Sequence, residues 1–168
     1  MTELKEKTSV LFVCMGNICR SPTAEGVFRH FAAEAGMTSL LQIDSAGTHA
    51  YHVGEPPDRR AQAAAARRGV ALDDIRARRV VVEDFERFDY VIAMDKDNVA
   101  RLQEVAEPEQ HHKIHLFLKF AEAGEQEVPD PYYGGSAGFE RVLDLVEDAS
   151  RGLLSEIRSA AAERRSRD

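Results

Sequence analysis

The sequence contains no apolar run long enough to cross a membrane, and residues 1–7, which precede its first apolar stretch, are charged rather than signal-like. Positive charge is not concentrated in any stretch, since 22 Lys and Arg are mixed among 29 Asp and Glu, for a formal net charge of −7. This balance argues against binding to nucleic acid or to an anionic membrane. We therefore expect a cytoplasmic protein with neither of these partners.

Cysteine is also scarce. The chain has two cysteines, Cys14 and Cys19, in one short segment, which excludes a disulfide framework and suits a reducing compartment. The six histidines are scattered and lack the spacing of a metal site beside the two cysteines. We assign no metal and no cofactor.

A chain of 168 residues fits one domain with its own apolar core. We expect this domain to span residues 8–160, with residues 1–7 and 163–168 as disordered tails. Short apolar runs predict strands at residues 9–14, 40–46, 88–94 and 113–118. Helical spacing of apolar residues predicts helices at residues 22–35, 59–68, 83–87, 96–105 and 136–162. This alternation is typical of an α/β fold, with a four-stranded parallel twisted sheet and helices on both faces.

The segment V-L-F-V-C-M-G-N-I-C-R-S-P, residues 10–22, predicts a buried strand, a short loop and the start of a helix. In such a turn the loop N–H groups and the free N–H groups of the first helical turn converge on one point, where the helix dipole adds positive charge. That point is an anion site, so we expect a phosphate-binding loop after the first strand.

Two side chains give this loop a chemistry. Cys14 ends the strand, where a helix N-terminus and a neighbouring cation favour the thiolate, so it is a candidate nucleophile. Arg20, six positions later, offers a planar fork of donors that matches two oxygens of a tetrahedral oxyanion.

Two further loops are predicted near the same end of the sheet, because ligands of parallel sheets bind beyond the carboxyl ends of the strands. Residues 47–58 follow the second strand and contain Tyr51 as their one large aromatic residue. The stretch V-P-D-P-Y-Y-G-G, residues 128–135, is too rich in proline and glycine for regular structure. Its Asp130 is a plausible acid, although an aspartate between prolines is more often a turn residue.

The motif C-M-G-N-I-C-R-S-P, together with V-P-D-P-Y-Y-G, resembles the low-molecular-weight protein tyrosine phosphatase family, over residues 8–160. The resemblance implies that Cys14 attacks phosphorus and forms a cysteinyl-phosphate intermediate, and that Arg20 and the loop amides bind the phosphoryl group. It implies that Asp130 is the general acid and base. The expected substrates are tyrosine-phosphorylated proteins, the expected product is inorganic phosphate, and we expect a monomer or weak dimer.

Other residues have an ordinary interpretation and a functional one that the resemblance adds. Ser21 is a helix N-cap, or also a hydrogen-bond partner of the Cys14 sulfur. Asn17 is a turn residue tolerant of left-handed angles, or also a brace of the loop. Cys19 is a packed thiol, or traps oxidised Cys14 as a reversible disulfide. The full set of expected substrate-binding residues is Met15, Gly16, Asn17, Ile18, Cys19, Ser21, Tyr51, Tyr132 and Tyr133, with the three tyrosines as walls of an aryl slot.

One departure from the family pattern concerns this brace. Many family members have a histidine that holds the loop asparagine, in the segment that matches residues 74–78 here. Ile75 occupies that position in this chain, so the means by which Asn17 is held is open.

Three alternatives remain beside the tyrosine phosphatase. An arsenate reductase on this scaffold relays electrons through cysteines outside the loop, and this chain has none there. A phosphoarginine phosphatase has threonine where this chain has Ile18. A non-catalytic phosphate-binding module would normally have lost the nucleophile or the acid, and both Cys14 and Asp130 are present.

Overall fold

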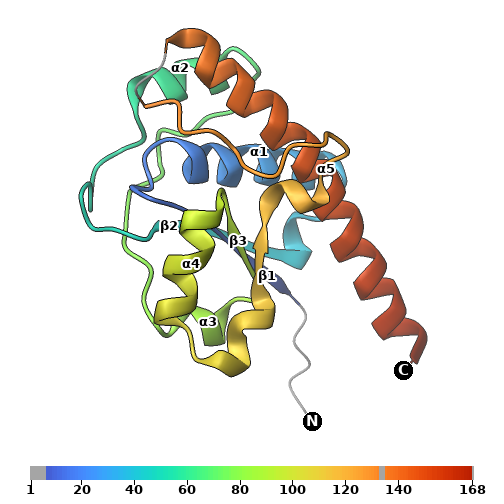
Figure 1. Ribbon diagram of the computed structural model, residues 1–168. Helices are drawn as coiled ribbons and strands as arrows, with labels where there is room; N and C mark the ends of the chain where they lie inside the picture. Colours follow the sequence, from blue (N-terminus) through green and yellow to red (C-terminus); the bar gives the residue numbers. More distant parts are fainter. Residues whose placement is uncertain (1–6, 133–134, 168) are drawn as a thin grey trace.

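The computed structural model describes residues 7–132 and 135–167. Its centre is a four-stranded sheet in the order β2-β1-β3-β4, in which every neighbouring pair is parallel (Figure 1). The strands are β1 Thr8–Cys14, β2 Leu41–Gly47, β3 Tyr90–Ala93 and β4 Ile114–Leu116. The helices are α1 Arg20–Glu34, α2 Arg59–Ala66, α3 Asp84–Arg87, α4 Lys96–Val105 and α5 Ser136–Arg167. The predicted fold class, with its parallel sheet, is confirmed.

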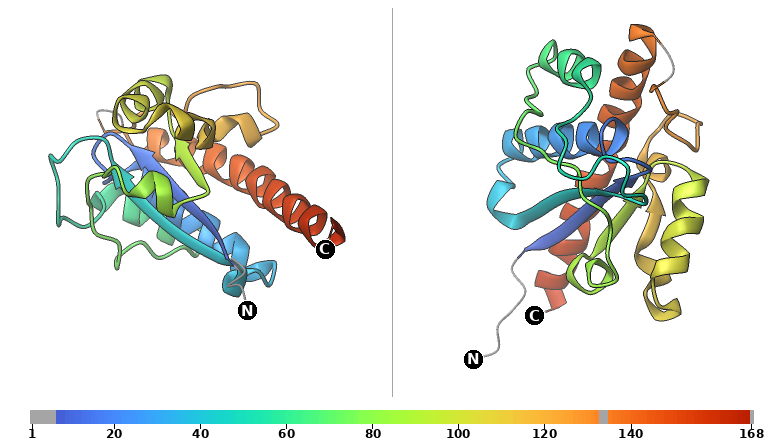
Figure 2. Two further views of the ribbon diagram at one scale, coloured as in Figure 1. Left: turned by 90° about the horizontal axis from the view of Figure 1, so that it is seen from below. Right: turned by 90° about the vertical axis from the view of Figure 1, so that its left-hand side faces the viewer.

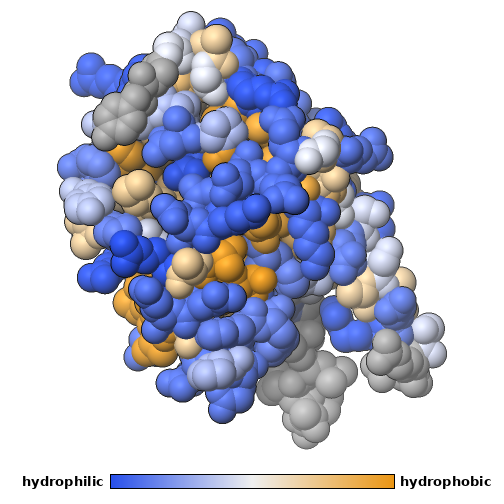
Figure 3. All heavy atoms as spheres, viewed as in Figure 1, coloured by the Kyte–Doolittle hydropathy of each residue, from blue (hydrophilic) through white to orange (hydrophobic). Residues whose placement is uncertain are grey.

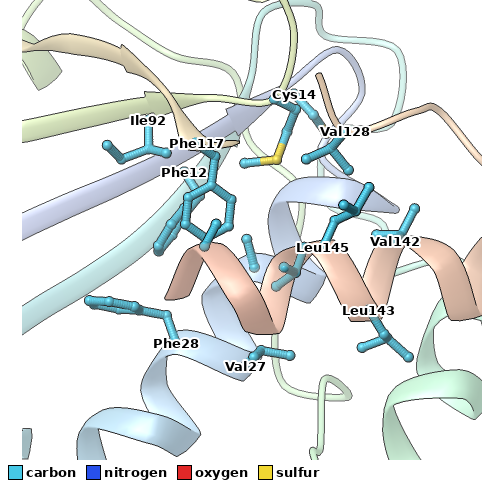
Figure 4. Close-up of a cluster of buried hydrophobic side chains, with 14 of the residues drawn as sticks. Phe12, Cys14, Val27, Phe28, Ile92, Phe117, Val128, Val142, Leu143 and Leu145 are labelled. Atoms are coloured by element: carbon cyan, nitrogen blue, oxygen red, sulfur yellow. The ribbon is translucent and has the colours of Figure 1, made fainter. Parts of the chain in front are cut away.

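The two faces of β1 are buried under different helices. Phe12 packs with Phe28 of α1 and with Phe117, at ring-centroid distances of 5.4 and 5.1 Å, in a cluster that α5 completes (Figure 4). Leu11 and Val13, which alternate with Phe12, join a second cluster with side chains of α3 and α4. Figure 2 shows the sheet between α1 and α5 on one side and α4 on the other. Helices therefore cover both faces, as predicted.

The end of β4 differs from the sequence prediction. Residues 113–118 were expected to form one strand, whereas β4 ends at Leu116 and Phe117–Phe120 is a 3-10 helix. Phe117 and Leu118 are fully or almost fully buried in the cluster shared with α5, so tertiary packing turns the chain before the apolar run ends.

The chain end differs as well. Helix α5 continues through residues 163–167, which we expected to form a disordered tail. Residues 160–167, A-A-A-E-R-R-S-R, consist mostly of strong helix formers, so the backbone stays helical although Glu163, Arg164 and Ser166 are exposed to solvent.

The face of the molecule drawn in Figure 3 is mostly hydrophilic, in contrast to the apolar core, and its apolar side chains lie in small separate areas. Within the described part of the chain, none of the helices is both long and apolar enough to cross a membrane.

Gly152 allows α5 to approach the segment after β4. A Cβ atom built on Gly152 would lie 1.7 Å from the carbonyl oxygen of Phe120, a backbone atom that cannot rotate away. The close packing of α5 on this 3-10 helix therefore requires glycine at position 152.

We predict that Gly152→Ala lowers the free energy of unfolding by about 2 kcal/mol or more, because overpacking against backbone outweighs the gain of about 1 kcal/mol in helix propensity. Urea denaturation measures the difference. Gly138→Ala in the same helix is the matched control, since its Cβ would lie 3.5 Å from Pro131, an ordinary contact. Equal effects of the two substitutions would contradict the steric explanation.

Candidate active site

The loop of residues 15–19 joins β1 to α1 at the carboxyl end of the sheet. Together with residues of two other loops it forms a pocket of about 230 Å³. The pocket is lined by Cys14, Met15, Gly16, Ile18, Cys19, Arg20, Tyr51, His52, Asp130 and Tyr132. The structure thus brings most of the expected site residues to one place. Tyr133 lies outside the described residues.

The Cys14 sulfur is buried and has two hydrogen-bond partners close to it. The backbone N–H of Asn17 donates to Sγ at 3.3 Å, and the Ser21 hydroxyl lies 3.0 Å from it. Donors in this position stabilise a thiolate over a thiol. The N-cap interpretation of Ser21 is wrong, because α1 begins at Arg20 with Cys19 as its N-cap residue.

The Asn17 side chain braces the loop. Among the described non-glycine residues, Asn17 is the one with a positive φ, which is +59°. Asparagine tolerates this left-handed conformation better than most residues. Its Nδ2 donates to Ser21 Oγ at 2.8 Å and to Ser45 Oγ on β2 at 3.0 Å, and its Oδ1 accepts from the Arg78 N–H at 3.0 Å. These bonds answer the question left open at Ile75, whose side chain is buried in the apolar core. The brace is supplied by Ser45 and by the backbone of Arg78.

Arg20 is held from behind. Its Nη1 donates to Asp95 Oδ2 at 2.7 Å and to the carbonyl oxygen of Val128 at 3.0 Å, and the residue is only 2% exposed. Its Nε is buried and has no hydrogen-bond partner within the described part of the chain. An unsatisfied buried donor on a cation that lines a pocket would be stabilised by an oxyanion ligand.

Asp130 lies across the pocket on the proline-flanked loop. Its Oδ2 is 3.7 Å from Nη2 of Arg20, and its Oδ1 accepts from the Tyr132 N–H at 3.0 Å. The carboxyl group is 37% exposed, whereas the thiol is buried. The arrangement therefore places a buried thiol and a buried guanidinium beside a more exposed carboxyl group.

The mouth of the pocket is apolar and aromatic. Met15, Tyr51 and Tyr132 are exposed there, and Tyr51 stacks on His49 at 5.0 Å between ring centroids. The loop that bears Tyr51 is bonded to the phosphate loop, since the N–H groups of Thr48 and His49 donate to the carbonyl oxygens of Cys14 and Met15.

Similarity to known proteins agrees with this geometry. The family model described as Low molecular weight phosphotyrosine protein phosphatase matches residues 9–163. The chain belongs to this family. It is 47% identical to a putative low molecular weight protein-tyrosine-phosphatase of Synechocystis, over 88% of this chain and 95% of the relative.

Solved structures of relatives share the fold. A protein tyrosine phosphatase from Entamoeba histolytica, crystallised with Hepes in its active site, superimposes with a TM-score of 0.89 at 41% identity, covering 92% of this chain and 99% of that one. YfkJ from Bacillus subtilis gives a TM-score of 0.87 at 40% identity, with 92% and 96% covered. With the family match, these relatives identify the chain as a phosphatase.

Sequence reasoning missed three residues of this phosphatase site: Ser45, Asp95 and His52. Asp95 follows β3 at the carboxyl end of the sheet, so its position could have suggested a place near the loop. It has two functions there, since Oδ2 holds Arg20 while Oδ1 caps α4 by accepting from the Asn98 N–H at 2.8 Å. Ser45 lies on β2 and His52 lies in the loop after it, and neither carried a sequence signal of its own.

Cys19 is a buried free thiol beside this site. Burial raises the pKa of Cys19, and the negative charge of Asp58 adds to the effect. A neutral thiol attacks oxidised sulfur slowly, so the burial of Cys19 is in keeping with a packed thiol, and its redox role stays a prediction.

We predict that Asn17→Gly lowers the free energy of unfolding by about 2 kcal/mol, because buried partners lose their hydrogen bonds while the backbone angle stays accessible. Asn17→Ala is the matched comparison, and we expect a further loss of about 1 kcal/mol from the left-handed conformation. Urea denaturation of both variants measures the two contributions separately. Wild-type stability of Asn17→Gly would show that the brace contributes nothing.

Proposed function

We propose that the enzyme hydrolyses phosphotyrosine in proteins through a cysteinyl-phosphate intermediate and releases inorganic phosphate. The observation that carries the proposal is the buried Cys14 sulfur, which accepts from the Asn17 N–H, lies 3.0 Å from the Ser21 hydroxyl and shares a pocket with the Arg20 guanidinium, whose Nε has no hydrogen-bond partner among the described residues. The Entamoeba relative with Hepes, a sulfonate, in its active site supports an oxyanion site at this place.

In the first step the phosphoryl oxygens accept hydrogen bonds from Arg20 and from the N–H groups of the loop. The Cys14 thiolate attacks phosphorus, so that a sulfur–phosphorus bond forms as the bond to the phenolic oxygen breaks. Asp130 gives its proton to the departing oxygen, which avoids release of a phenolate. The products are tyrosine and phosphocysteine.

In the second step water attacks the phosphocysteine. Asp130, now a carboxylate, takes a proton from the water as the sulfur–phosphorus bond breaks. The leaving thiolate is stabilised by the Ser21 hydroxyl at 3.0 Å. Inorganic phosphate leaves, and the enzyme returns to its starting protonation state.

The pocket walls favour an aryl ester. Ile18 lines the pocket, and Tyr51 and Tyr132 lie at its mouth. Burial of a flat phenyl ring against these side chains makes the free energy of binding more favourable. A phosphoarginine guanidinium would lose its water there without a polar partner from Ile18. The proposed binding site also includes Met15, Gly16, Asn17, Cys19, Ser21 and Tyr133. We further propose that the enzyme is cytoplasmic, that it is a monomer or weak dimer, and that residues 8–160 form its one domain.

We predict that Cys14→Ser reduces turnover of p-nitrophenyl phosphate by at least about 1,000-fold, because a serine hydroxyl without an adjacent base is a poor nucleophile. Binding of inorganic phosphate, measured by calorimetry, should persist and serves as the control for folding. Rapid quenching with labelled substrate should trap a phosphoenzyme in the wild type alone. Turnover by Cys14→Ser at the wild-type rate would refute the mechanism.

We predict that Asp130→Asn slows phosphoenzyme formation from phosphotyrosine by about 100-fold or more, and much less from esters with acidic leaving groups, because only the first needs a proton. Glu127→Gln is the matched control in the same loop, an exposed carboxylate that accepts from the Lys96 N–H. Equal losses with both kinds of substrate would remove Asp130 from the acid role.

A further inference from the structure

Glu25 is a buried carboxylate that the proposed chemistry does not use. It lies in α1, is 5% exposed, and accepts from Ser45 Oγ and from Arg29 Nη2, both at 2.6 Å. Burial raises the pKa of Glu25, and the negative charges of Asp44 and Asp74 add to this rise, whereas Ser45 and Arg29 oppose it. A carboxylate in such surroundings is costly to keep, which points to a specific task.

A chain of hydrogen bonds leads from this carboxylate to the nucleophile. Ser45 Oγ donates to Glu25 and accepts from Asn17 Nδ2 at 3.0 Å. The same Nδ2 donates its second hydrogen to Ser21 Oγ at 2.8 Å, and Ser21 Oγ lies 3.0 Å from the Cys14 sulfur.

Two groups with fixed hydrogen-bond roles, the Glu25 carboxylate and the Arg78 N–H, set the direction of these hydrogen bonds. A carboxylate only accepts and a backbone N–H only donates. Glu25 therefore takes the one hydroxyl hydrogen of Ser45, which leaves Ser45 as an acceptor. The Arg78 N–H faces the Asn17 oxygen, so the Asn17 nitrogen must face both serines.

This direction determines where the Ser21 hydrogen goes. Because Ser21 Oγ accepts from Asn17, its single hydrogen is free for another acceptor. The Cys14 sulfur is 3.0 Å away and the carbonyl oxygen of Ala46 is 3.5 Å away, so the sulfur, an anion in the proposed mechanism, is the better acceptor. With the Asn17 amide reversed, its oxygen would compete for this hydrogen.

We infer that Glu25 is a positioning residue that keeps the Ser21 hydrogen on the Cys14 sulfur, by holding Ser45 as an acceptor and so fixing the orientation of the Asn17 amide together with the Arg78 N–H. The inference rests on the proposed function in that Cys14 works as a thiolate. It assigns to a residue outside the pocket a part in the reactivity of the nucleophile.

The test is the rate at which iodoacetamide alkylates Cys14, followed by mass spectrometry of its peptide at one near-neutral pH. Glu25→Gln should slow alkylation about tenfold, because an amide at position 25 can donate to Ser45 and the sulfur loses a charge-assisted hydrogen bond. Removal of a negative charge would by itself favour the thiolate. The expected sign is therefore opposite to that of a purely Coulombic effect.

Two variants control for folding and for charge. Glu34→Gln makes the same change at the exposed end of α1 and should leave the alkylation rate unchanged. Ser45→Ala breaks the chain from the other side and should reproduce the slow alkylation, which keeps the test decisive if Glu25→Gln does not fold. Protection of Cys14 by inorganic phosphate should stay within about twofold of the wild type in both slow variants, whereas a purely structural role of Glu25 would weaken it.

A double-mutant cycle with Ser21→Ala completes the test. Since the hydrogen bonds from Glu25 act on the sulfur only through Ser21, Glu25→Gln should cause no further slowing in the Ser21→Ala background. Wild-type alkylation in Glu25→Gln, an equal loss in both backgrounds, or weakened phosphate protection would overturn the inference. Alkylation needs no turnover, so failure of the wild type to hydrolyse phosphotyrosine would refute the proposed function separately.

Discussion

The shape of the phosphate loop depends on the Asn17 side chain. A left-handed backbone angle at φ +59° is unfavourable for most L-residues, and it persists here because Asn17 is bonded to α1, to β2 and to the backbone at Arg78. The residue at 78 is itself fixed, since its guanidinium donates to Asp44 and to the fully buried Asp84. The positions of the groups beside the Cys14 sulfur, the Asn17 N–H and the Ser21 hydroxyl, are thus set by the sheet and its neighbours rather than by the loop alone.

Local parts of this site could be predicted from the sequence, and parts assembled over long distances could not. Cys14 and Arg20 stand six positions apart in one strand, loop and helix, so their proximity follows from local geometry. Ser45 and Asp95 reach them only because β2 and β3 flank β1, an order that hydrophobic patterns do not encode. Glu25 lies five positions after Arg20 in α1, and nothing in the local sequence sets it apart from other acidic residues. Its burial against Ser45 is visible only in three dimensions.

The limits of the helices and strands show the same division. Residues 96–105 were predicted as a helix and match α4, where capping and periodicity agree. The predicted fourth strand was too long because a run of apolar residues does not reveal where packing against α5 turns the chain. At residues 163–167, polarity was taken to mean disorder, whereas helix propensity alone continues the backbone of α5.

The hydrogen bonds between the loop of residues 48–58 and the phosphate loop of residues 15–19 bear on how substrate preference can change. One end of the loop of residues 48–58 is bonded to Cys14 and Met15 through the N–H groups of Thr48 and His49. Its other end is bonded through the Asp58 N–H, which donates to the carbonyl oxygen of Ile18. The exposed tip with Tyr51 and Val53 lies between these ties. Mutations accumulating at the tip can therefore change the surface offered to a phosphoprotein, while the side chains proposed to act on the phosphate ester, Cys14 and Arg20, keep their places. Recognition and chemistry are free to evolve at different rates in one small domain.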